Sequence, residues 1–316
     1  MYVTSLRTDG LRFAHDDAVD LSSRLVHLTD GPANLALFDA LELFCAACEA
    51  EHLESALSRL DVVDPFEDLE VTAEHGLPEQ VSFAHGDAES LLRPDGTRTI
   101  KVRADLALDP LLYGTLREQA LRDPRLVTAL GDATASVTVG WAFTNDLHTA
   151  SIARLQVRIG EVSFPSSGNE RPRWLAPWLR DIAGRFRRIT ADDLDVVAER
   201  LIEAALSSDP AMRQRYHTLC QALEAPPFNL GRLELVHLRG EVTPCFGPEL
   251  VRPRLVGRRG AELLQIATAV LIDQPDVLLI ERIDPADAPL LAWLESATEG
   301  EDAVLEQVLV AQGAPR

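Results

Sequence analysis

Apolar positions change their spacing several times along the chain, and each change predicts a different kind of element. The first 29 residues alternate over short runs, which predicts two or three short strands. From Leu35 to about Leu60 the apolar residues recur at helical spacing and predict one long helix. Residues 62–160 return to alternation. Three strands are expected there, at Arg98–Leu108, Ala135–Thr144 and Ile152–Ile159.

The second half of the chain predicts helices first and apolar strands afterwards. A helix is expected to begin at Pro177 and to continue through Phe186, with Arg180 and Arg187 on its polar side. A second amphipathic helix follows the cap residue Thr190. The remaining expected elements are a helix from about Pro210 to Leu223 and strands at Val277–Arg282 and Gln307–Ala311; the turn-rich stretches Phe164–Pro172 and Ala225–Arg232 are typical of linkers.

The segment Leu25–Leu41 has the strand, turn and helix order of a phosphate-binding loop without its chemistry. Such a loop has the pattern G-x-x-x-x-G-K-[ST], and nothing after Gly31 supplies a second glycine, a lysine or a hydroxyl. The glycines let backbone N–H groups surround phosphate, the lysine neutralises charge, and the hydroxyl holds Mg²⁺. The only lysine of the chain, Lys101, lies in a predicted strand. No nucleotide binding is therefore expected at the vestigial loop Gly31, Pro32, Ala33 and Asn34.

The N-terminal region resembles the start of ABC-type ATPase heads of the RecF/SMC class, within the AAA/P-loop superfamily. The resemblance rests on MYVTSLRTDGLRF, AVDL, LVHLTDGP and LALFDALELF, read in that order. Against the family pattern, about three residues of the loop are missing.

The C-terminal region carries the other half of the resemblance. Val256–Glu262 stands where the family has its Ser-Gly-Gly-Glu signature, and Val277–Arg282 resembles a Walker B strand. The resemblance places the metal-site aspartate at Glu281 and the water-activating glutamate at Arg282, whose guanidinium cannot accept a proton. After the last strand, Gly313 takes the place of the family's histidine.

The resemblance implies an α/β fold: an ABC/SMC-head-like P-loop fold with a mixed sheet, an antiparallel β subdomain and a helical insertion. Residues 1–163 would form the N-terminal part of the ATPase-like lobe with the antiparallel β region. Residues 164–228 would form the helical insertion, and 229–316 the C-terminal part of the lobe. No heptad repeat is sustained over three or four heptads, so no long coiled coil is expected.

Charge and composition narrow the possible partners. The formal net charge is −20, with 50 acidic and 30 basic residues, which disfavours nonspecific binding to nucleic acid even though relatives of the resembling class often act on DNA. Four cysteines are too few for a disulfide scaffold. No long apolar run or leader pattern is present, so a cytoplasmic protein without a membrane partner is expected.

Two interpretations remain for the cysteines of the first helix. Cys45, Cys48 and His52 share one helical face and could ligate zinc, but the same positions continue an apolar stripe, which favours packing. The eight histidines show no spacing typical of a metal site or a catalytic triad. No metal site and no catalytic residue are expected.

Arginine clusters offer the best candidate surfaces for a partner. Arginine with tryptophan suits an acidic protein, a phosphate-bearing ligand or nucleic acid, whereas an ordinary solvated helix face is the alternative. Arginines at the signature-like loop could meet phosphates of a nucleotide on an opposite subunit. The candidates are Trp174, Trp178, Arg180, Arg187, Arg188, Arg258 and Arg259.

These observations together predict a catalytically inactive ABC/RecF/SMC-like pseudo-ATPase. It would act as a protein-binding scaffold or regulatory subunit, paired with an active ATPase or with a second copy of itself, and without a cofactor. One alternative is a divergent but active NTPase in DNA repair, chromosome maintenance or phage defence, which would use ATP and Mg²⁺. Another is a nucleic-acid-associated adaptor that binds through the Arg-rich segment.

Overall fold

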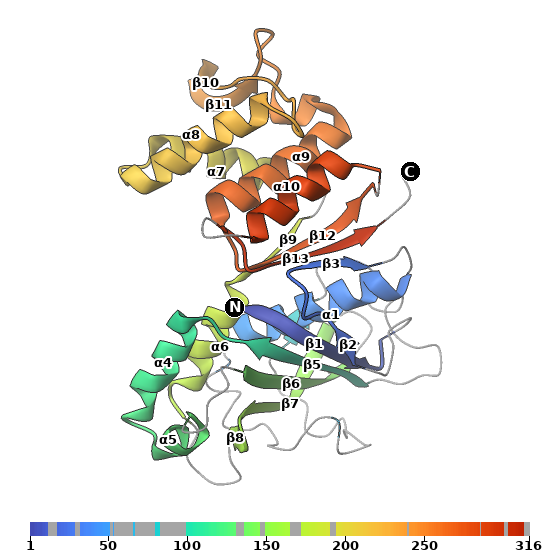
Figure 1. The fold of residues 1–316 in the computed structure, drawn as a ribbon, viewed down its shortest axis with the longest axis vertical. Helices are drawn as coiled ribbons and strands as arrows, with labels where there is room; N and C mark the ends of the chain where they lie inside the picture. Colours follow the sequence, from blue (N-terminus) through green and yellow to red (C-terminus); the bar gives the residue numbers. More distant parts are fainter. Residues whose placement is uncertain are drawn as a thin grey trace. The chain divides into compact units, whose positions relative to one another are not determined.

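The computed structural model describes most of the chain. The described residues are 1–11, 18–28, 32–50, 53, 66, 80–82, 99–130, 136–145, 149–164, 172–189, 194–238, 240–284, 286–299 and 303–312. Contacts divide the chain into two compact units (Figure 1). Unit 1 comprises residues 1–23 and 29–186, and unit 2 comprises 24–28 and 187–316.

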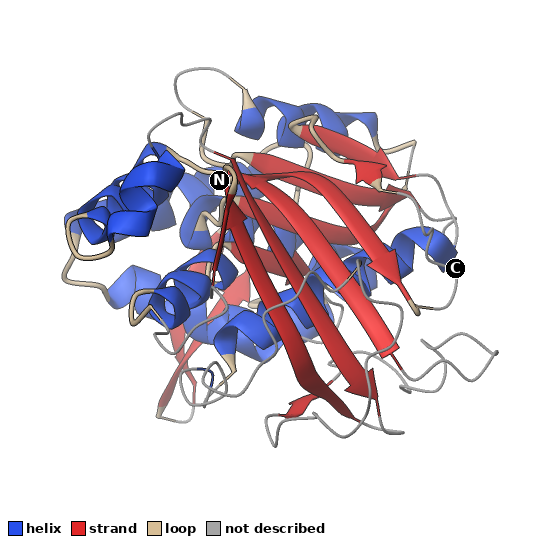
Figure 2. Ribbon diagram, turned by 90° about the horizontal axis from the view of Figure 1, so that it is seen from below, coloured by secondary structure: helices blue, strands red, loops and turns tan. Residues whose placement is uncertain are grey.

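Unit 1 contains an antiparallel sheet of seven strands. The strand order is β2-β1-β5-β6-β7-β4, with β8 also paired to β7, and the longest strands run side by side in Figure 2. Alternate residues of β5 are buried along most of its length, as expected for a sheet with one packed face. The three strands predicted between residues 98 and 159 are confirmed. The bounds are β1 Tyr2–Asp9, β2 Val19–Asp20, β4 Gln80–Ser82, β5 Thr99–Ala107, β6 Ser136–Asn145, β7 Thr149–Ile159 and β8 Val162–Phe164.

Helix α1, Pro32–Glu49, packs in unit 1 against α6, Leu175–Ala183, and against β4. Phe38 and Phe44 of α1 are buried, and the ring of Phe44 lies 6.3 Å from the ring of Phe186, which follows α6. The helix predicted from Leu35 to about Leu60 starts earlier, and its predicted end is wrong, because α1 ends at Glu49 and Ala50 is not helical. Residues 51–52 and 54–60 lie outside the described part of the chain. Two further helices of the unit are α4, Pro110–Ala120, and α5, Pro124–Leu130.

Unit 2 contains a four-stranded sheet in the order β3-β13-β12-β9. β3 is parallel to β13, and β13 is parallel to β12. The central strands are nearly continuous apolar runs, because parallel strands are covered on both faces. The predicted α/β class with both parallel and antiparallel strands is confirmed. The bounds are β3 Leu25–Leu28, β9 Phe186–Ile189, β12 Val277–Ile283 and β13 Gln307–Gln312.

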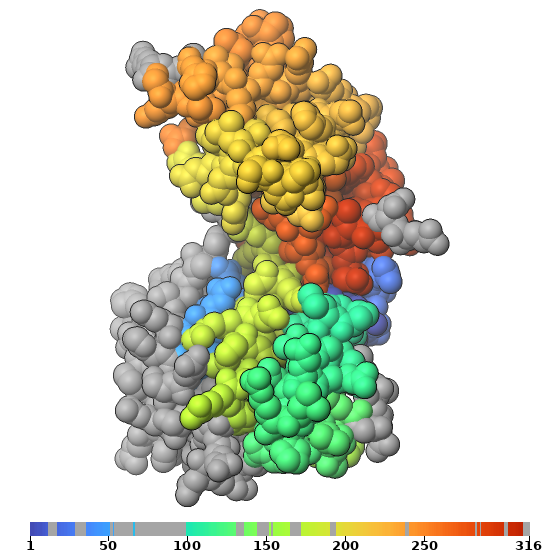
Figure 3. Space-filling view, turned by 90° about the vertical axis from the view of Figure 1, so that its left-hand side faces the viewer, coloured from blue at the N-terminus to red at the C-terminus, as the bar shows by residue number. Residues whose placement is uncertain are grey.

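The helices of unit 2 bury a common apolar core with this sheet, to which Leu201, Leu264 and Leu278 contribute. α7 and α8 pack against each other and form a continuous yellow surface in Figure 3. The two helices predicted in this region are confirmed. The bounds are α7 Leu194–Leu206, α8 Pro210–Glu224, η2 Pro253–Leu255, α9 Gly257–Thr268, the π-helix η3 Ala269–Asp273, and α10 Ala288–Thr298; a hairpin of β10 Leu233–Leu238 and β11 Glu241–Phe246 was not predicted.

The helix expected to run from Pro177 through Phe186 is wrong in its second half. α6 ends at Ala183 with Gly184 as its cap, and the next residues form β9. Glycine is a weak helix former, and the segment after it gains strand pairing beside β12. The expected domain boundaries after residues 163 and 228 stay predictions. Among the described residues, no helix combines the length and apolar character needed to cross a membrane.

Candidate functional site at one edge of the parallel sheet

The segments that resemble nucleotide-binding motifs leave the parallel sheet at the same edge. Leu28, the last residue of β3, is level with Ala311 of β13, and Gln312 is level with Ile283 of β12. In open sheets with parallel strands, ligands bind at the carboxyl ends of the strands. The topology therefore places the ends of β3, β12 and β13 at one edge of the unit 2 sheet. Gly31 and Gly313 lie outside the described residues.

The connection from β3 to α1 consists of residues 29–31 alone, because β3 ends at Leu28 and α1 begins at Pro32. Proline has no backbone N–H, so the first residue of the helix offers no donor to an anion. The connection also contains the carboxylate-bearing Asp30, which repels phosphate. Ala33 and Asn34 continue the first turn of α1. This helix start is a poor place for a triphosphate compared with a glycine-rich loop.

Glu281, at the metal-site position of the resemblance, is held by Arg188 of the neighbouring strand. Arg188 donates to Oε1 of Glu281 from Nε at 2.8 Å, and Nη2 lies 2.6 Å from the same oxygen. The two side chains are only 10% and 25% exposed. A charge-assisted pair of this geometry is stronger than a neutral hydrogen bond. The structure thus brings together two residues that the sequence assigned to different roles. Arg282 follows in β12, and the structure does not describe its side chain.

The signature-like arginines bind carboxylates of their own chain. At the start of α9, Nε of Arg258 lies 3.4 Å from Oε1 of Glu262, and Nη1 of Arg259 lies 3.5 Å from Oε2 of the same residue. Arg259 also pairs with Asp287, which caps α10 by accepting from the N–H of Leu290. Their predicted role in meeting a phosphate or a partner stays a prediction, and it would require these pairs to open.

Trp174 and Trp178 are packed inside unit 1, where they are 8% and 2% exposed. Nε1 of Trp174 donates to Oδ2 of Asp123 at 3.3 Å, and its ring contacts the rings of Phe164 and Trp178 edge-on. This packing gives both tryptophans a structural role and leaves little of either ring for stacking on a partner. Arg180, on the same helix, is half-buried. Partner binding by these three residues is not tested by the structure.

The two cysteines of α1 differ in burial, since Cys48 is buried and Cys45 is half-buried. Cys48 is fully buried, and burial raises the pKa of its thiol well above the ordinary value. Burial, followed by the charge of neighbouring Cys48, also raises the pKa of the Cys45 thiol. A metal ligand must be a thiolate, which such an environment disfavours. His52 lies outside the described residues, and the described part of the chain holds no cluster of three His, Cys, Asp or Glu residues arranged for a metal.

Sequence reasoning missed a set of polar side chains around α9 and the π-helix. Gln265 and Thr268 are 3% and 2% exposed, although they interrupt an otherwise apolar helical run. Polar residues at buried helical positions were the available signal, because such groups require a hydrogen-bond partner. Their surroundings are described below.

No protein-family model and no curated protein matches the chain. The similar solved structures include an SMC head bound to the C-winged helix domain of ScpA, with 12% identity, 99% of this chain and 90% of that chain covered, and a TM-score of 0.49. The SMC head domain from Thermotoga maritima has 12% identity, the same coverage and a TM-score of 0.43. The recombination mediator protein RecF, in its ATPrS form, has 8% identity, 99% and 93% coverage and a TM-score of 0.46.

Proposed function

We propose that the protein is an ATPase-like head that does not hydrolyse ATP and that acts as a protein-binding scaffold or regulatory subunit of a larger complex. The ion pair of Arg188 with Glu281 carries this proposal. A Walker B-like carboxylate supports catalysis by binding Mg²⁺ directly or through water. In this chain the same carboxylate neutralises a guanidinium of its own sheet.

Mg²⁺ binding would require Glu281 to release Arg188. The guanidinium would then stay in a place where its side chain is only 10% exposed. Removing one partner of a fully buried ion pair costs about 3–5 kcal/mol, and a pair partly open to water costs less. Metal binding therefore begins with an unfavourable step. The adjacent Arg282 adds a positive charge in the position of the water-activating glutamate.

The start of α1 after β3 also supports the proposed loss of ATP hydrolysis, because it is poorly suited to bind the phosphates of a nucleotide. A phosphate-binding loop surrounds its anion with several backbone N–H groups and a lysine. Residues 29–31 provide a short connection, Pro32 lacks an N–H, and no lysine follows. The two halves of a nucleotide site, the anion cradle and the metal carboxylate, are thus both unfavourable. Without ATP hydrolysis, the protein would act through its contacts with other proteins.

The surface at the start of α9 is the first place to look for that contact. Leu255 is 72% exposed directly before the helix, and the side chain of Arg258 is 62% exposed. An apolar group beside an arginine is a common composition at protein interfaces. The occupant would be an active ATPase or a second copy of this chain. Size-exclusion chromatography with light scattering distinguishes the second copy, and Leu255→Asp is expected to abolish the association.

Calorimetric titration of the full chain with ATP and Mg²⁺ tests the proposal. We expect no saturable binding at millimolar ATP and no Mg²⁺-dependent release of phosphate, measured beside an intact ABC-type head as a positive control. Micromolar affinity, together with turnover that disappears in Glu281→Gln, would refute the proposal and establish the divergent NTPase instead. Arg188→Gln provides the matched variant, because it frees Glu281 but leaves the loop after β3 unchanged.

The nucleic-acid adaptor has less support from the structure. Arg185 pairs with Asp109 and Arg188 with Glu281, so two arginines of the Arg-rich segment bind carboxylates within the chain. Together with the formal charge of −20, this disfavours an open phosphate-binding face. A salt-dependent mobility shift with DNA at low ionic strength would reverse this ranking.

A further inference from the structure

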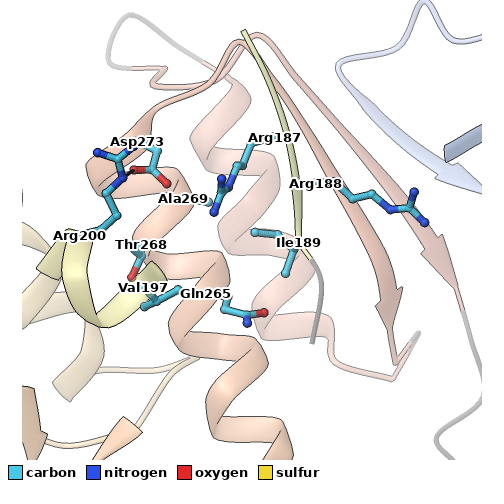
Figure 4. Close-up of a pocket in the computed structure, with 9 residues that line it drawn as sticks. All are labelled: Arg187, Arg188, Ile189, Val197, Arg200, Gln265, Thr268, Ala269 and Asp273. Atoms are coloured by element: carbon cyan, nitrogen blue, oxygen red, sulfur yellow. Dashed lines mark ion pairs between the residues drawn. The ribbon is translucent and has the colours of Figure 1, made fainter. Parts of the chain in front are cut away.

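A hollow in unit 2 lies between β9, α7, α9 and η3 (Figure 4). Arg187 and Ile189 project from β9 toward α9, whereas Arg188 between them projects to the other side of the strand. This alternation follows from strand geometry. The hollow is therefore separate from the Glu281 pair, although both use arginines of the same strand.

Three polar side chains at the hollow have buried atoms that find no hydrogen-bond partner among the described residues. They are the amide oxygen and nitrogen of Gln265, the hydroxyl of Thr268 and Nε of Arg187. An unsatisfied buried polar group costs about 1–3 kcal/mol, so native proteins nearly always provide a partner. The amide nitrogen, the hydroxyl and the guanidinium N–H can each donate a hydrogen bond, and the amide oxygen and the hydroxyl oxygen can each accept one.

The charges around the hollow leave Arg187 as its cation without an ion pair. Arg200 lies 3.8 Å from the carboxylate of Asp273 and bonds Glu203 at 3.0 Å. Arg188 is paired with Glu281 on the other side of β9. Arg187 has only a longer-range attraction to Asp273 and no hydrogen bond or ion pair among the described residues. A guanidinium beside neutral donors favours an oxyanion.

The backbone at the hollow departs from the regular α-helix. Gln274 donates its N–H to Ala269 at 2.8 Å, a bond across five residues that widens the last turn of the helix. In an α-helix, residues five apart point roughly 140° away from each other. The widened turn brings Thr268 and Asp273 to the same hollow. Single π-turns of this kind occur frequently at functional sites.

We propose that this hollow binds the carboxylate of a small ligand that carries a hydroxyl or an N–H next to that carboxylate. Arg187 and Thr268 donate to the carboxylate oxygens, and the amide nitrogen of Gln265 donates a third hydrogen bond. The amide oxygen of Gln265 accepts from the neighbouring hydroxyl or N–H. A carboxylate fits better than phosphate, because the guanidinium of Arg200 is already paired with Asp273 and Glu203, and the carboxylate of Asp273 repels a second negative charge. The site does not depend on the proposed loss of ATP hydrolysis.

Ligand-observed NMR and thermal-shift titrations of the full chain test this site. The probes are lactate, with a hydroxyl beside its carboxylate, N-acetylglycine, with an amide N–H, and propionate, with neither donor. We expect saturable binding of at least one of the first two probes and binding of propionate on the order of tenfold weaker. Tighter binding of lactate would indicate a free hydroxy acid, and tighter binding of N-acetylglycine would indicate a peptide terminus.

Variants of the hollow separate this proposal from unspecific anion binding. Arg187→Gln and Thr268→Val are each expected to weaken binding on the order of tenfold. Arg232→Gln removes an exposed arginine elsewhere in unit 2 and is expected to leave binding unchanged. Circular dichroism establishes that each variant folds, and Thr268→Ser serves as the conservative variant that should retain binding. Equal binding of all probes, equal binding by Arg187→Gln, or a crystal soaked with the tighter-binding probe that shows water alone in the hollow would overturn the proposal.

Discussion

Arg188 of β9 and Glu281 of β12 are separated by 93 residues in sequence, yet Nε of the arginine donates to Oε1 of the glutamate at 2.8 Å. The two strands are neighbours at the edge of the unit 2 sheet. A position that resembles a metal-binding carboxylate has therefore become one half of a structural ion pair. Under the proposed loss of ATP hydrolysis, this carboxylate would stabilise the sheet through Arg188 in place of binding Mg²⁺.

Breaking this pair on one side should destabilise the protein. Arg188→Met leaves Glu281 without its cation and is expected to lower the free energy of unfolding by about 1–3 kcal/mol. The double variant Arg188→Met with Glu281→Met should lose much less than the sum of the single losses. Urea unfolding of the unmodified protein, the two single variants and the double variant measures the coupling free energy between the two side chains. Strict additivity would show that the two side chains do not stabilise each other.

Asp273 predicts a pH dependence of stability. Burial raises the pKa of its carboxyl group, Glu203 raises it further, and the charges of Arg187 and Arg200 compensate only in part. Asp273→Asn should therefore raise the free energy of unfolding at neutral pH. Because the folded pKa lies above the unfolded value, the native state takes up the proton first as the pH falls. The advantage of the variant should shrink as the pH falls through the folded pKa and vanish below the unfolded pKa, as thermal melts at several pH values would show.

Asp109 predicts the opposite dependence in unit 1. Its partial burial acts to raise the pKa, but the N–H of Leu112, the N-terminal ammonium and Arg185 outweigh burial and lower it. The stabilisation is present above the unfolded pKa and is lost as the pH falls through the folded pKa. Asp109→Ala should cost about 1–2 kcal/mol near neutral pH, since it also removes the cap of α4. Asp109→Asn keeps a capping side chain and should cost less; an equal loss in both variants would assign the whole effect to charge.

Two glycines of unit 1 provide a matched pair of substitutions. Gly10 has a φ of +80°, and an added Cβ would collide with the backbone carbonyl of Thr99. Gly10→Ala is expected to lower the free energy of unfolding by about 2 kcal/mol or more. Gly114 lies within α4, where an added Cβ meets nothing within 4 Å. Gly114→Ala should stabilise by about 0.5–1 kcal/mol. Chemical denaturation compares them, and a stable Gly10→Ala would contradict the close approach at Thr99.

Periodicity predicted the regular elements well wherever local pattern and packing agree. β5 occupies Thr99–Ala107 within the strand expected at Arg98–Leu108, because alternation places one side of it in the core of unit 1. α8 begins at Pro210, where proline fits the first turn and Asp209 supplies the cap. The segment Phe186–Ile189 shows the limit of periodicity. Its residues fit either a helix or a strand, and pairing beside β12 selects the strand.

For the candidate sites too, the sequence predicts some features, and only the tertiary structure determines the others. The sequence alone shows the missing loop chemistry, since a backbone cradle needs residue types that do not follow Gly31, and the only lysine of the chain, Lys101, lies in a strand. The surroundings of the Glu281 and Arg187 side chains could not be predicted from the sequence. Strand alternation sends adjacent arginines to opposite sides of β9, one onto a carboxylate of β12 and the other into the hollow beside Gln265. Contacts between segments far apart in sequence depend on how the chain folds back on itself, which no local pattern of residues encodes.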